Sequence, residues 1–299
     1  MDHDSLDREP DSTANPSESF PTGRPTERGS AMSDPNGTGV VALADRLWQA
    51  SVDRRPIEPI TRARPDLTVH DAYAIQAHNV RRLVAAGAMI RGRRMGRTSG
   101  PRQAVVGVDE PDFGVLLDEM FLDEGDDIPV ELFVQPRVVA TMAFVLATDL
   151  AGPGVTIADA LTAVAGVMPA IEIVDSRIAS WKVQIADTIA DNASAGKVVL
   201  GGRITPVDAL ELRLVGVLLH RNGSPIESAA GAAALGNPAR CIGWLANELG
   251  SVGRGLRRGD IVLTGPLHRL VPVRPADYFH AEFAHLGNVT VQFADRSPA

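Results

Sequence analysis

The sequence predicts an α+β fold, with helices near its start and a large mixed β-sheet or barrel after them. Apolar residues recur at helical spacing just after residue 40, and runs rich in β-branched residues recur between residues 88 and 294. Turn signals at Asn222-Gly223 and Gly287-Asn288 interrupt these runs. The chain has 299 residues, 44% of them hydrophobic, which is enough for a substantial core. We therefore expect one folded domain over residues 40–299.

Residues 1–39 are expected to form a disordered acidic tail. They hold eight of the acidic residues and three of the basic ones, and Ser, Pro, Thr, Asp and Gly dominate. So few apolar side chains cannot offset the entropy lost on ordering. The tail also lacks the basic start and apolar stretch of a secretory signal.

Two helices are expected first. The first ends before Pro56 and carries a helical apolar stripe made of Val41, Ala44, Leu47 and Trp48. Thr68 and Asp71 resemble a capping box that opens the second helix, and Gly87 stands at its C-cap.

Strands then dominate. We expect them at residues 88–96, 133–148, 168–175, 197–202, 212–222, 260–265, 269–273 and 278–294. A helix at 156–167 interrupts them, and another begins at Asn237 with Pro238 in its first position.

Composition excludes several classes of function. The formal charge of −8 argues against nucleic acid as the main partner, and no apolar run approaches the ~18 residues of a membrane span. One cysteine, Cys241, cannot make an internal disulfide or a cysteine-rich zinc site. Phosphate-binding loops, Gly-x-Ser-x-Gly and His-Glu-x-x-His are missing. We expect a cytoplasmic protein without a nucleic-acid or membrane partner.

Four polar clusters interrupt apolar strands. They are Glu172 among β-branched residues, the basic stretch 92–99, the turn 191–196, and residues 264–268 at a strand end. Each also has a structural interpretation: a carboxylate paired with an arginine, a solvated strand edge, ordinary turn formers and a hydrogen-bonded His268. From the residues alone, a pocket of carboxylate and arginine for an organic acid is one interpretation among these.

The chain resembles the hydratase/decarboxylase family of the fumarylacetoacetate hydrolase superfamily, whose members include 2-oxopent-4-enoate hydratase and 4-oxalocrotonate decarboxylase. The blocks that carry the resemblance run in order from about residue 40 to 296. They are residues 71–76, 92–99, 110–114, 135–138 with 143–146, 171–178, 190–194, 236–238 and 259–265. The resemblance implies a mixed sheet or barrel with N-terminal helices, assembly as a homo-oligomer, and Mg²⁺ or Mn²⁺ holding a 2-oxo or 2-hydroxydienoate substrate.

The ligand positions that the resemblance implies are Val139, Thr141 and Glu172, so one carboxylate stands where the family has three. Arg94 stands in place of the family's lysine, and Arg97 replaces an apolar residue. Mg²⁺ prefers about six oxygen ligands, and arginine stays protonated. We therefore expect no tightly bound metal and no other cofactor.

Two hypotheses follow. In the first, the chain is a repurposed, metal-independent lyase for hydration, decarboxylation or cyclisation of an unsaturated 2-oxo or other enolisable acid. Its predicted catalytic residues are Glu172, Arg94, Asp112 and His268, and its predicted substrate-binding residues are Arg97, Thr98, Ser99 and Ser194. In the second, the chain is a non-catalytic binder or a stabilising partner of an active homologue. An ordinary Mg²⁺-dependent 2-oxopent-4-enoate hydratase is the third choice.

Overall fold

The computed structural model describes residues 39–96, 98 and 111–295. The predicted tail, apart from Gly39, and the predicted ligand-binding residues Arg97 and Ser99 lie outside these described residues.

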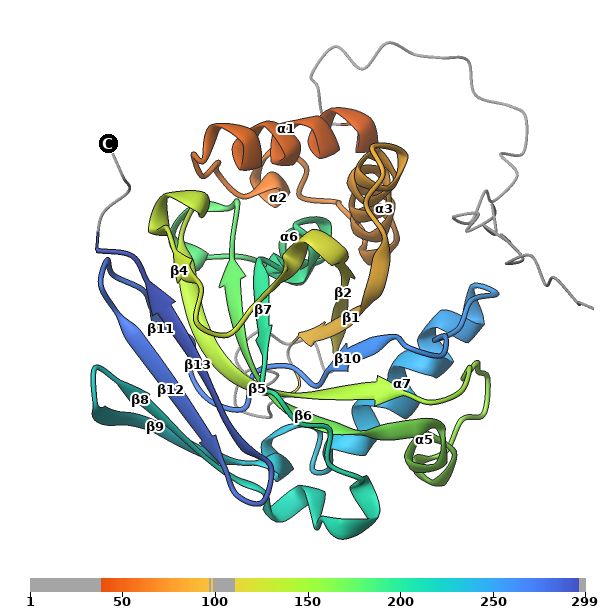
Figure 1. The fold of residues 1–299 in the computed structure, drawn as a ribbon. Helices are drawn as coiled ribbons and strands as arrows, with labels where there is room; N and C mark the ends of the chain where they lie inside the picture. Colours follow the sequence, from red (N-terminus) through yellow and green to blue (C-terminus); the bar gives the residue numbers. More distant parts are fainter. Residues whose placement is uncertain (1–38, 97, 99–110, 296–299) are drawn as a thin grey trace, which may run out of the picture. The chain divides into compact units, whose positions relative to one another are not determined.

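Three helices open the described chain: α1 (Val40–Asp53), α2 (Ile60–Ala63) and α3 (Val69–Ala85). Thr68 begins α3 with the expected capping box, because its hydroxyl accepts from Asp71 N at 3.1 Å while the Asp71 carboxylate accepts from Thr68 N at 3.2 Å. Together with the later helix α6 (Ile185–Ala190), these helices surround a small apolar core. Figure 1 shows the four helices gathered at one end of the strands.

The larger sheet has eight strands, in the order β2-β1-β10-β5-β6-β7-β3, with β11 paired to β5. These strands are β1 (Ile90–Gly96), β2 (Asp112–Leu117), β3 (Phe121–Leu122), β5 (Pro136–Leu146), β6 (Val164–Asp175), β7 (Lys197–Leu200), β10 (Ile261–Leu263) and β11 (Val271–Pro272). The longest ladder joins β5 to β6 in antiparallel register, with Val139 opposite Glu172. The pleat turns alternate residues of both strands to one face.

The second sheet has five strands in the order β4-β13-β12-β8-β9. They are β4 (Asp127–Ile128), β8 (Gly216–Arg221), β9 (Ser224–Ala230), β12 (Tyr278–Phe283) and β13 (Gly287–Phe293). The predicted turn at Asn222-Gly223 joins β8 to β9, and both residues have positive φ, 51° and 81°. Two successive positive φ values are typical of a two-residue hairpin turn.

Two further helices, α5 (Ile157–Ala163) and α7 (Pro238–Ser251), pack against each other away from the N-terminal helices. The Asn237 side chain accepts from Ala239 N at 3.0 Å and so begins α7 where the sequence predicts it. Short 3₁₀ turns complete the chain: η1 (Asp118–Met120), η2 (Val130–Leu132), η3 (Ala179–Trp181), η4 (Asn192–Ser194), η5 (Val207–Ala209), η6 (Leu212–Leu214) and η7 (Gly231–Ala233).

Several predicted boundaries are wrong. The helix expected over 156–167 ends at Ala163, because residues from Val164 onward pair with β5 as the start of β6. Residues 212–214 form a 3₁₀ turn instead of the start of a strand. The prediction also missed α2, α6, β2, β3, β4 and β9, most of which are short and lack a clear hydrophobic period.

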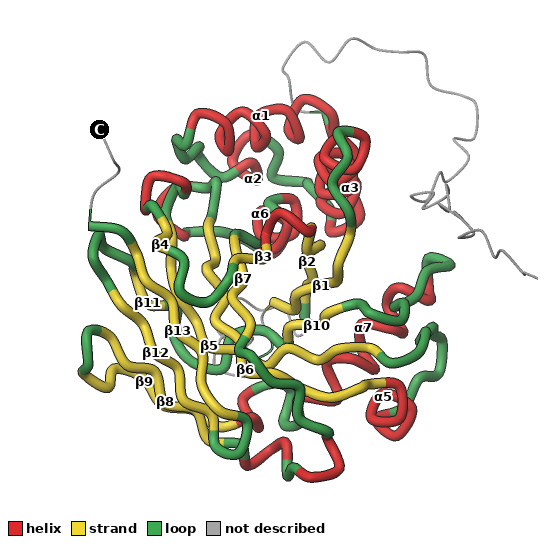
Figure 2. The backbone as a smooth tube through the Cα atoms, viewed as in Figure 1, coloured by secondary structure: helices red, strands yellow, loops and turns green. Residues whose placement is uncertain are grey.

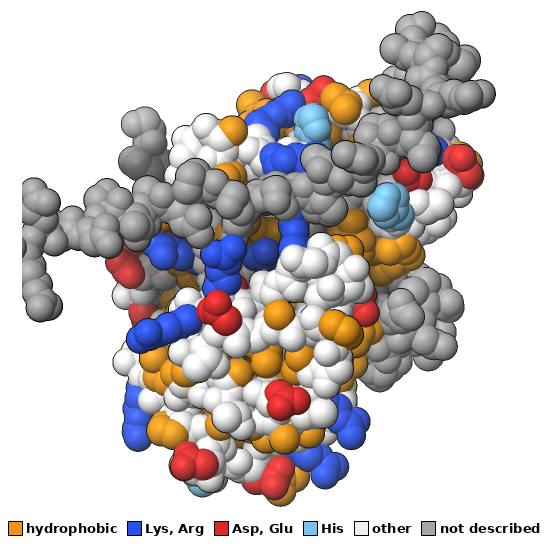
Figure 3. Space-filling view, turned by 90° about the vertical axis from the view of Figure 1, so that its right-hand side faces the viewer, with side chains coloured by type: hydrophobic (Ala, Val, Ile, Leu, Met, Phe, Trp, Pro, Cys, Tyr) orange, Lys and Arg blue, Asp and Glu red, His pale blue; other side chains and the backbone are white. Residues whose placement is uncertain are grey.

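The main apolar core lies between the two sheets and α7, and includes Phe144 of β5, Ile171 of β6, Phe279 of β12 and Leu245 of α7. Figure 2 shows the strands of both sheets as neighbouring curved layers. On the face in Figure 3, most basic side chains gather across the upper half, while acidic ones are scattered among neutral and apolar ones. Among the described helices, none has the length and apolarity to cross a membrane.

Candidate active site

One face of the larger sheet, here called the inner face, gathers most of the predicted site. Strand registers place Gly96 opposite Asp112, Arg94 opposite Gly114, and Val139 opposite Glu172. These positions alternate with core residues such as Met95 and Ile171, so their side chains point the other way. The residues on this face that belong to the predicted site or to the ligand positions implied by the resemblance are Arg94, Asp112, Val139, Thr141 and Glu172. All are 3% exposed or less.

Arg94 and Glu172 form a buried ion pair at the centre of the inner face. Arg94 Nε lies 2.5 Å from Glu172 Oε1, and Arg94 Nη2 donates a hydrogen bond to Oε2 at 3.2 Å. Both side chains are almost fully buried. Glu172 is therefore paired with an arginine, as its structural interpretation predicts. That arginine is itself a predicted catalytic residue, so the contact also agrees with the functional interpretation.

Asp112 adds a second buried carboxylate beside this pair. A Cβ at Gly96 would lie 2.3 Å from Asp112 Oδ1, so a side chain at the opposite position would have to displace this carboxylate. Burial raises the pKa of Glu172 above its ordinary value; Arg94 offsets part of this rise, and the charge of Asp112 adds to it. A carboxyl with a raised pKa can exchange protons nearer to neutral pH than an exposed one.

The η4 turn closes the inner face. Asn192 bonds twice to Val115 of β2, through Oδ1 to the backbone N at 2.8 Å and through Nδ2 to the carbonyl at 2.9 Å. Arg94 Nη1 donates to the carbonyl of Ala193. Because η4 leads directly into β7, these bonds join strands near opposite ends of the sheet, which makes it barrel-like, as predicted.

Three successive residues of η4 have left-handed backbones: Asn192, Ala193 and Ser194, with φ of 52°, 52° and 58°. Each costs of order 1 kcal/mol or more for a non-glycine residue. Ser194, a predicted substrate-binding residue, is buried, and its hydroxyl lies 3.4 Å from Asp191 Oδ2. The turn thus holds a strained conformation beside Arg94.

The Arg177 side chain binds residues on both sides of this turn. Its Nε lies 2.5 Å from Asp191 Oδ1, and its Nη1 donates to Ala195 O at 2.9 Å. Burial raises the pKa of Asp191 to about 6, although the charge of Arg177 acts in the opposite direction. The predicted site omitted Arg177, whose only sequence signal is its place just after the strand that carries Glu172.

The residues at the ligand positions that the resemblance implies do not fit a divalent cation. Val139 has no donor atom, and the Thr141 hydroxyl donates to Gly265 O at 2.9 Å. Glu172 is paired with a guanidinium, as described above. A hard cation needs several oxygen ligands, and this trio supplies one carboxylate that already faces a positive charge.

Thr98 lies next to this group. Its side chain is buried, its Oγ1 has no hydrogen-bond partner among the described residues, and a Cβ at Gly265 would lie 2.6 Å from it. The Gly265 carbonyl also accepts a hydrogen bond from the Thr141 hydroxyl, so this glycine lies next to both threonines.

His268 is held by backbone groups on both sides of its ring. Nε2 accepts from Ala140 N at 3.0 Å, and Nδ1 lies 2.7 Å from Arg269 O. Burial lowers the pKa of His268, which favours the neutral ring that this pattern requires. No contact among the described residues joins His268 to Arg94 or Glu172, and its catalytic role stays a prediction.

A cavity of about 320 Å³ lies beside the η4 turn and is lined in part by Asn192. Its walls include Trp48, Asn79, Arg177, Asp191 and Lys197, but none of Arg94, Asp112 or Glu172. The Arg177–Asp191 ion pair therefore lines this cavity, whereas Arg94, Asp112 and Glu172 of the inner face do not.

Comparison with known proteins identifies the family of the chain. Residues 90–294 match the family model described as fumarylacetoacetate (FAA) hydrolase C-terminal. The chain is 43% identical over 250 residues to a 2-keto-4-pentenoate hydratase of Paraburkholderia xenovorans, covering 84% of this chain and 93% of that protein. It is 39% identical over 257 residues to a 2-oxo-hept-4-ene-1,7-dioate hydratase of Escherichia coli, covering 84% and 96%.

A solved structure shares the fold. The 4-oxalocrotonate decarboxylase of Pseudomonas putida G7, complexed with magnesium and adipate, superposes with a TM-score of 0.83 at 34% identity, over 85% of this chain and 97% of that one. These relatives support a lyase-type enzyme acting on 2-oxo acids. The resemblance found in the sequence is confirmed: the chain belongs to the fumarylacetoacetate hydrolase C-terminal family.

Proposed function

We propose that this protein is a lyase for an unsaturated 2-oxo acid in which Arg94 supplies the positive charge of the active site and no tightly bound metal is needed. The observation that carries the proposal is the buried Arg94–Glu172 ion pair, on the face that also holds Val139 and Thr141, where the resemblance implies carboxylates. Hydration, decarboxylation or cyclisation of such an acid each develops negative charge on an enolate oxygen.

The relatives support the substrate class. They include hydratases named for 2-keto-4-pentenoate and 2-oxo-hept-4-ene-1,7-dioate, and the decarboxylase structure contains the dicarboxylate adipate. A small organic acid is therefore the expected ligand. Planar guanidinium groups bind carboxylates through two parallel hydrogen bonds.

Arg94 would stabilise the enolate. It is held in place by Glu172 on one side and the Ala193 carbonyl on the other, so its orientation is fixed before the substrate binds. A preorganised cation at a buried site stabilises developing charge more strongly than one in water. Arginine cannot act as the base, because its pKa is too high.

Glu172 and Asp112 would then move the proton. Both are fully buried, and the pKa of Glu172 is raised by burial and by the neighbouring Asp112. Two carboxyl groups whose charges disfavour each other suit an acid–base pair. Thr98 and Ser194, which are both buried, would contact the polar groups of the substrate.

Calorimetric titration of chelator-treated protein tests the proposal. The titrants are Mg²⁺, Mn²⁺ and oxalate, a mimic of a 2-oxo acid, and the proteins are the wild type, Arg94→Ala and the matched surface control Arg91→Ala. We expect oxalate to bind without metal, this binding to be lost in Arg94→Ala, and Arg91→Ala to bind as the wild type does.

Two other outcomes would contradict the proposal. Mg²⁺ binding by the wild type with a Kd in the micromolar range would return the Mg²⁺-dependent hydratase to first place. Binding of neither metal nor oxalate would favour the non-catalytic partner of an active homologue, which co-purification with such a homologue would then test.

A further inference from the structure

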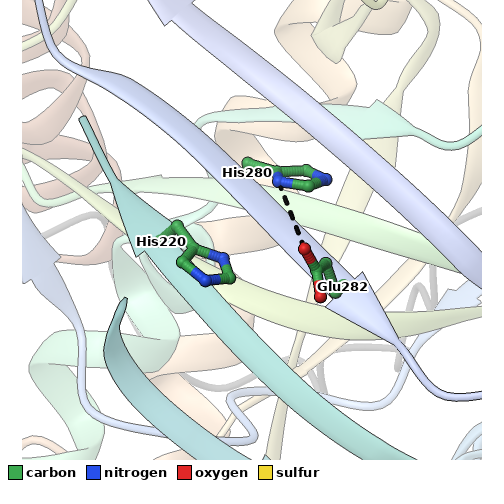
Figure 4. Close-up of side chains that lie close together, drawn as sticks. All are labelled: His220, His280 and Glu282. Atoms are coloured by element: carbon green, nitrogen blue, oxygen red, sulfur yellow. Dashed lines mark ion pairs between the residues drawn. The ribbon is translucent and has the colours of Figure 1, made fainter. Parts of the chain in front are cut away.

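A second cluster of titratable side chains lies on the five-stranded sheet, whereas the inner face belongs to the eight-stranded sheet. It consists of His220 on β8 and of His280 and Glu282 on β12, and is here called the His-His-Glu cluster. Figure 4 shows the three side chains projecting from the two adjacent strands toward one another.

The strand register brings these residues together. His280 is the direct cross-strand partner of His220, and Glu282, two residues further along β12, points to the same face. The alternating residues Phe279, Ala281 and Phe283 face the core, so the cluster lies on the opposite, outer face of the sheet. Glu282 is half-exposed, which leaves a path for a small ligand from the solvent.

The donor atoms already lie close to one another. His280 Nδ1 is 3.7 Å from Glu282 Oε1, and one donor atom from each residue lies within 4.8 Å of the others. The two imidazole rings are stacked, with centroids 5.8 Å apart and planes inclined by 23°. In a tetrahedral zinc site, nitrogen and oxygen ligands about 2.0–2.2 Å from the metal stand roughly 3.3 Å apart. Side-chain rotations alone can therefore bring the donors to that spacing.

One donor lacks a partner. His220 Nδ1 is buried and has no hydrogen bond to any of the described residues. A buried polar atom without a partner costs free energy, and a bound cation would satisfy it. The His220 ring that carries this nitrogen is stacked on the ring of His280, whose Nδ1 faces Glu282.

We propose that the His-His-Glu cluster binds a divalent transition-metal ion, with Zn²⁺ as the best fit, and that water completes the coordination. Two imidazoles and one carboxylate are a common ligand set for zinc and a poor one for Mg²⁺, which prefers oxygen ligands only. The site does not depend on the proposed lyase activity, because it shares no residue with the inner face.

The test is calorimetric titration of chelator-treated, untagged full-length protein with zinc chloride. We expect one Zn²⁺ per chain from this cluster. The proteins compared are the wild type, His220→Ala, His280→Ala and Glu282→Gln, with His70→Ala as the control, since His70 is an exposed histidine on α3. Loss of a direct ligand should weaken binding at least as much as loss of an outer-shell partner, which costs roughly 10–100-fold.

Melting temperatures measured without zinc show whether each variant still folds, and added zinc should raise the melting temperature of the wild type and His70→Ala only. Cobalt(II) gives an independent readout, since its visible absorption bands intensify when it is bound in a tetrahedral site. Zinc affinity that is unchanged in folded His220→Ala and His280→Ala, or absent from the wild type, would overturn the proposal.

Discussion

Arg94 on β1 and Glu172 on β6 meet in an ion pair of 2.5 Å although β10 and β5 lie between their strands. Strands in a sheet are about 4.8 Å apart, so a flat sheet would hold these two backbones roughly 14 Å apart. The contact therefore depends on the curl of the sheet, which the η4 turn maintains through its bonds to Val115 and Arg94.

The first prediction concerns the energy of this pair. Arg94→Met leaves a fully buried carboxylate without its cation, and we expect a loss of about 3–5 kcal/mol in the free energy of unfolding. The double variant Arg94→Met with Glu172→Gln removes both charges and should be more stable than Arg94→Met alone. Urea unfolding of the wild type, Arg94→Met, Glu172→Gln and the double variant measures the coupling free energy between the two side chains. Additive effects would mean that the two side chains do not interact.

The second prediction concerns metal binding. Restoring the family pattern with Arg94→Lys, Val139→Glu and Thr141→Glu should create a carboxylate site around Glu172, because positions 139 and 172 are direct cross-strand partners. We expect Mg²⁺ binding by calorimetry in this triple variant and none in the wild type. The control combines Arg94→Lys with Val139→Gln and Thr141→Gln, which adds similar side chains without charge. Equal Mg²⁺ affinity in the two triple variants would count against this assignment of positions.

The third prediction concerns the proton carrier. Because the pKa of Glu172 is raised above its ordinary value of 4.5, turnover should depend on pH through a group that titrates above that value. In Glu172→Gln, we expect turnover of a 2-oxo acid to fall by about 10²–10⁴-fold, the usual contribution of general acid–base catalysis. The pH–rate profile of the residual activity should no longer show the change in rate that this group causes. A profile of unchanged shape would assign the titration to another group, with Asp112→Asn as the next variant to measure.

The fourth prediction concerns the close approach of β2 to the η4 turn. A Cβ at Gly114 would lie 2.3 Å from the Asn192 backbone oxygen, whereas a Cβ at Gly216 meets nothing closer than 3.9 Å. Gly114→Ala should lower the free energy of unfolding by about 1–3 kcal/mol, as overpacking does. Gly216→Ala, also a strand glycine, is the matched control and should stay within about 0.5 kcal/mol of the wild type. Equal stability of both variants would show that η4 can move away from β2.

The fifth prediction concerns Asp191. Its pKa is raised from 3.8 to about 6 by burial, so between these values the folded chain holds a proton that the unfolded chain has released. The contribution of this group to the free energy of unfolding therefore falls as pH rises from about 4 to 6. Asn cannot titrate, so the stability of Asp191→Asn relative to wild type should rise over this interval, although its absolute stability is lower because Arg177 loses its partner. Denaturant unfolding at several pH values measures the difference. A constant difference would place the pKa of Asp191 outside the interval.

The sequence alone determined the family, the α+β class and the ends of the best-signalled elements, because these depend on local patterns. The capping box at Thr68, the Asn222-Gly223 turn and the Asn237 cap each act within a few residues of chain. The lack of carboxylates at Val139 and Thr141, the ligand positions that the resemblance implies, was also visible in the sequence.

Tertiary structure decided what those residues contact. No local pattern predicts that Arg94 pairs with Glu172, that three left-handed residues of η4 close the sheet, or that Arg177 anchors this turn. The helix predicted over 156–167 ended early because pairing with β5 outweighed local helical propensity. His220 and His280 are 60 positions apart and became neighbours only through the register of β8 and β12. Contacts between strands depend on register and curvature, which arise when distant segments pack, so only the folded structure contains them.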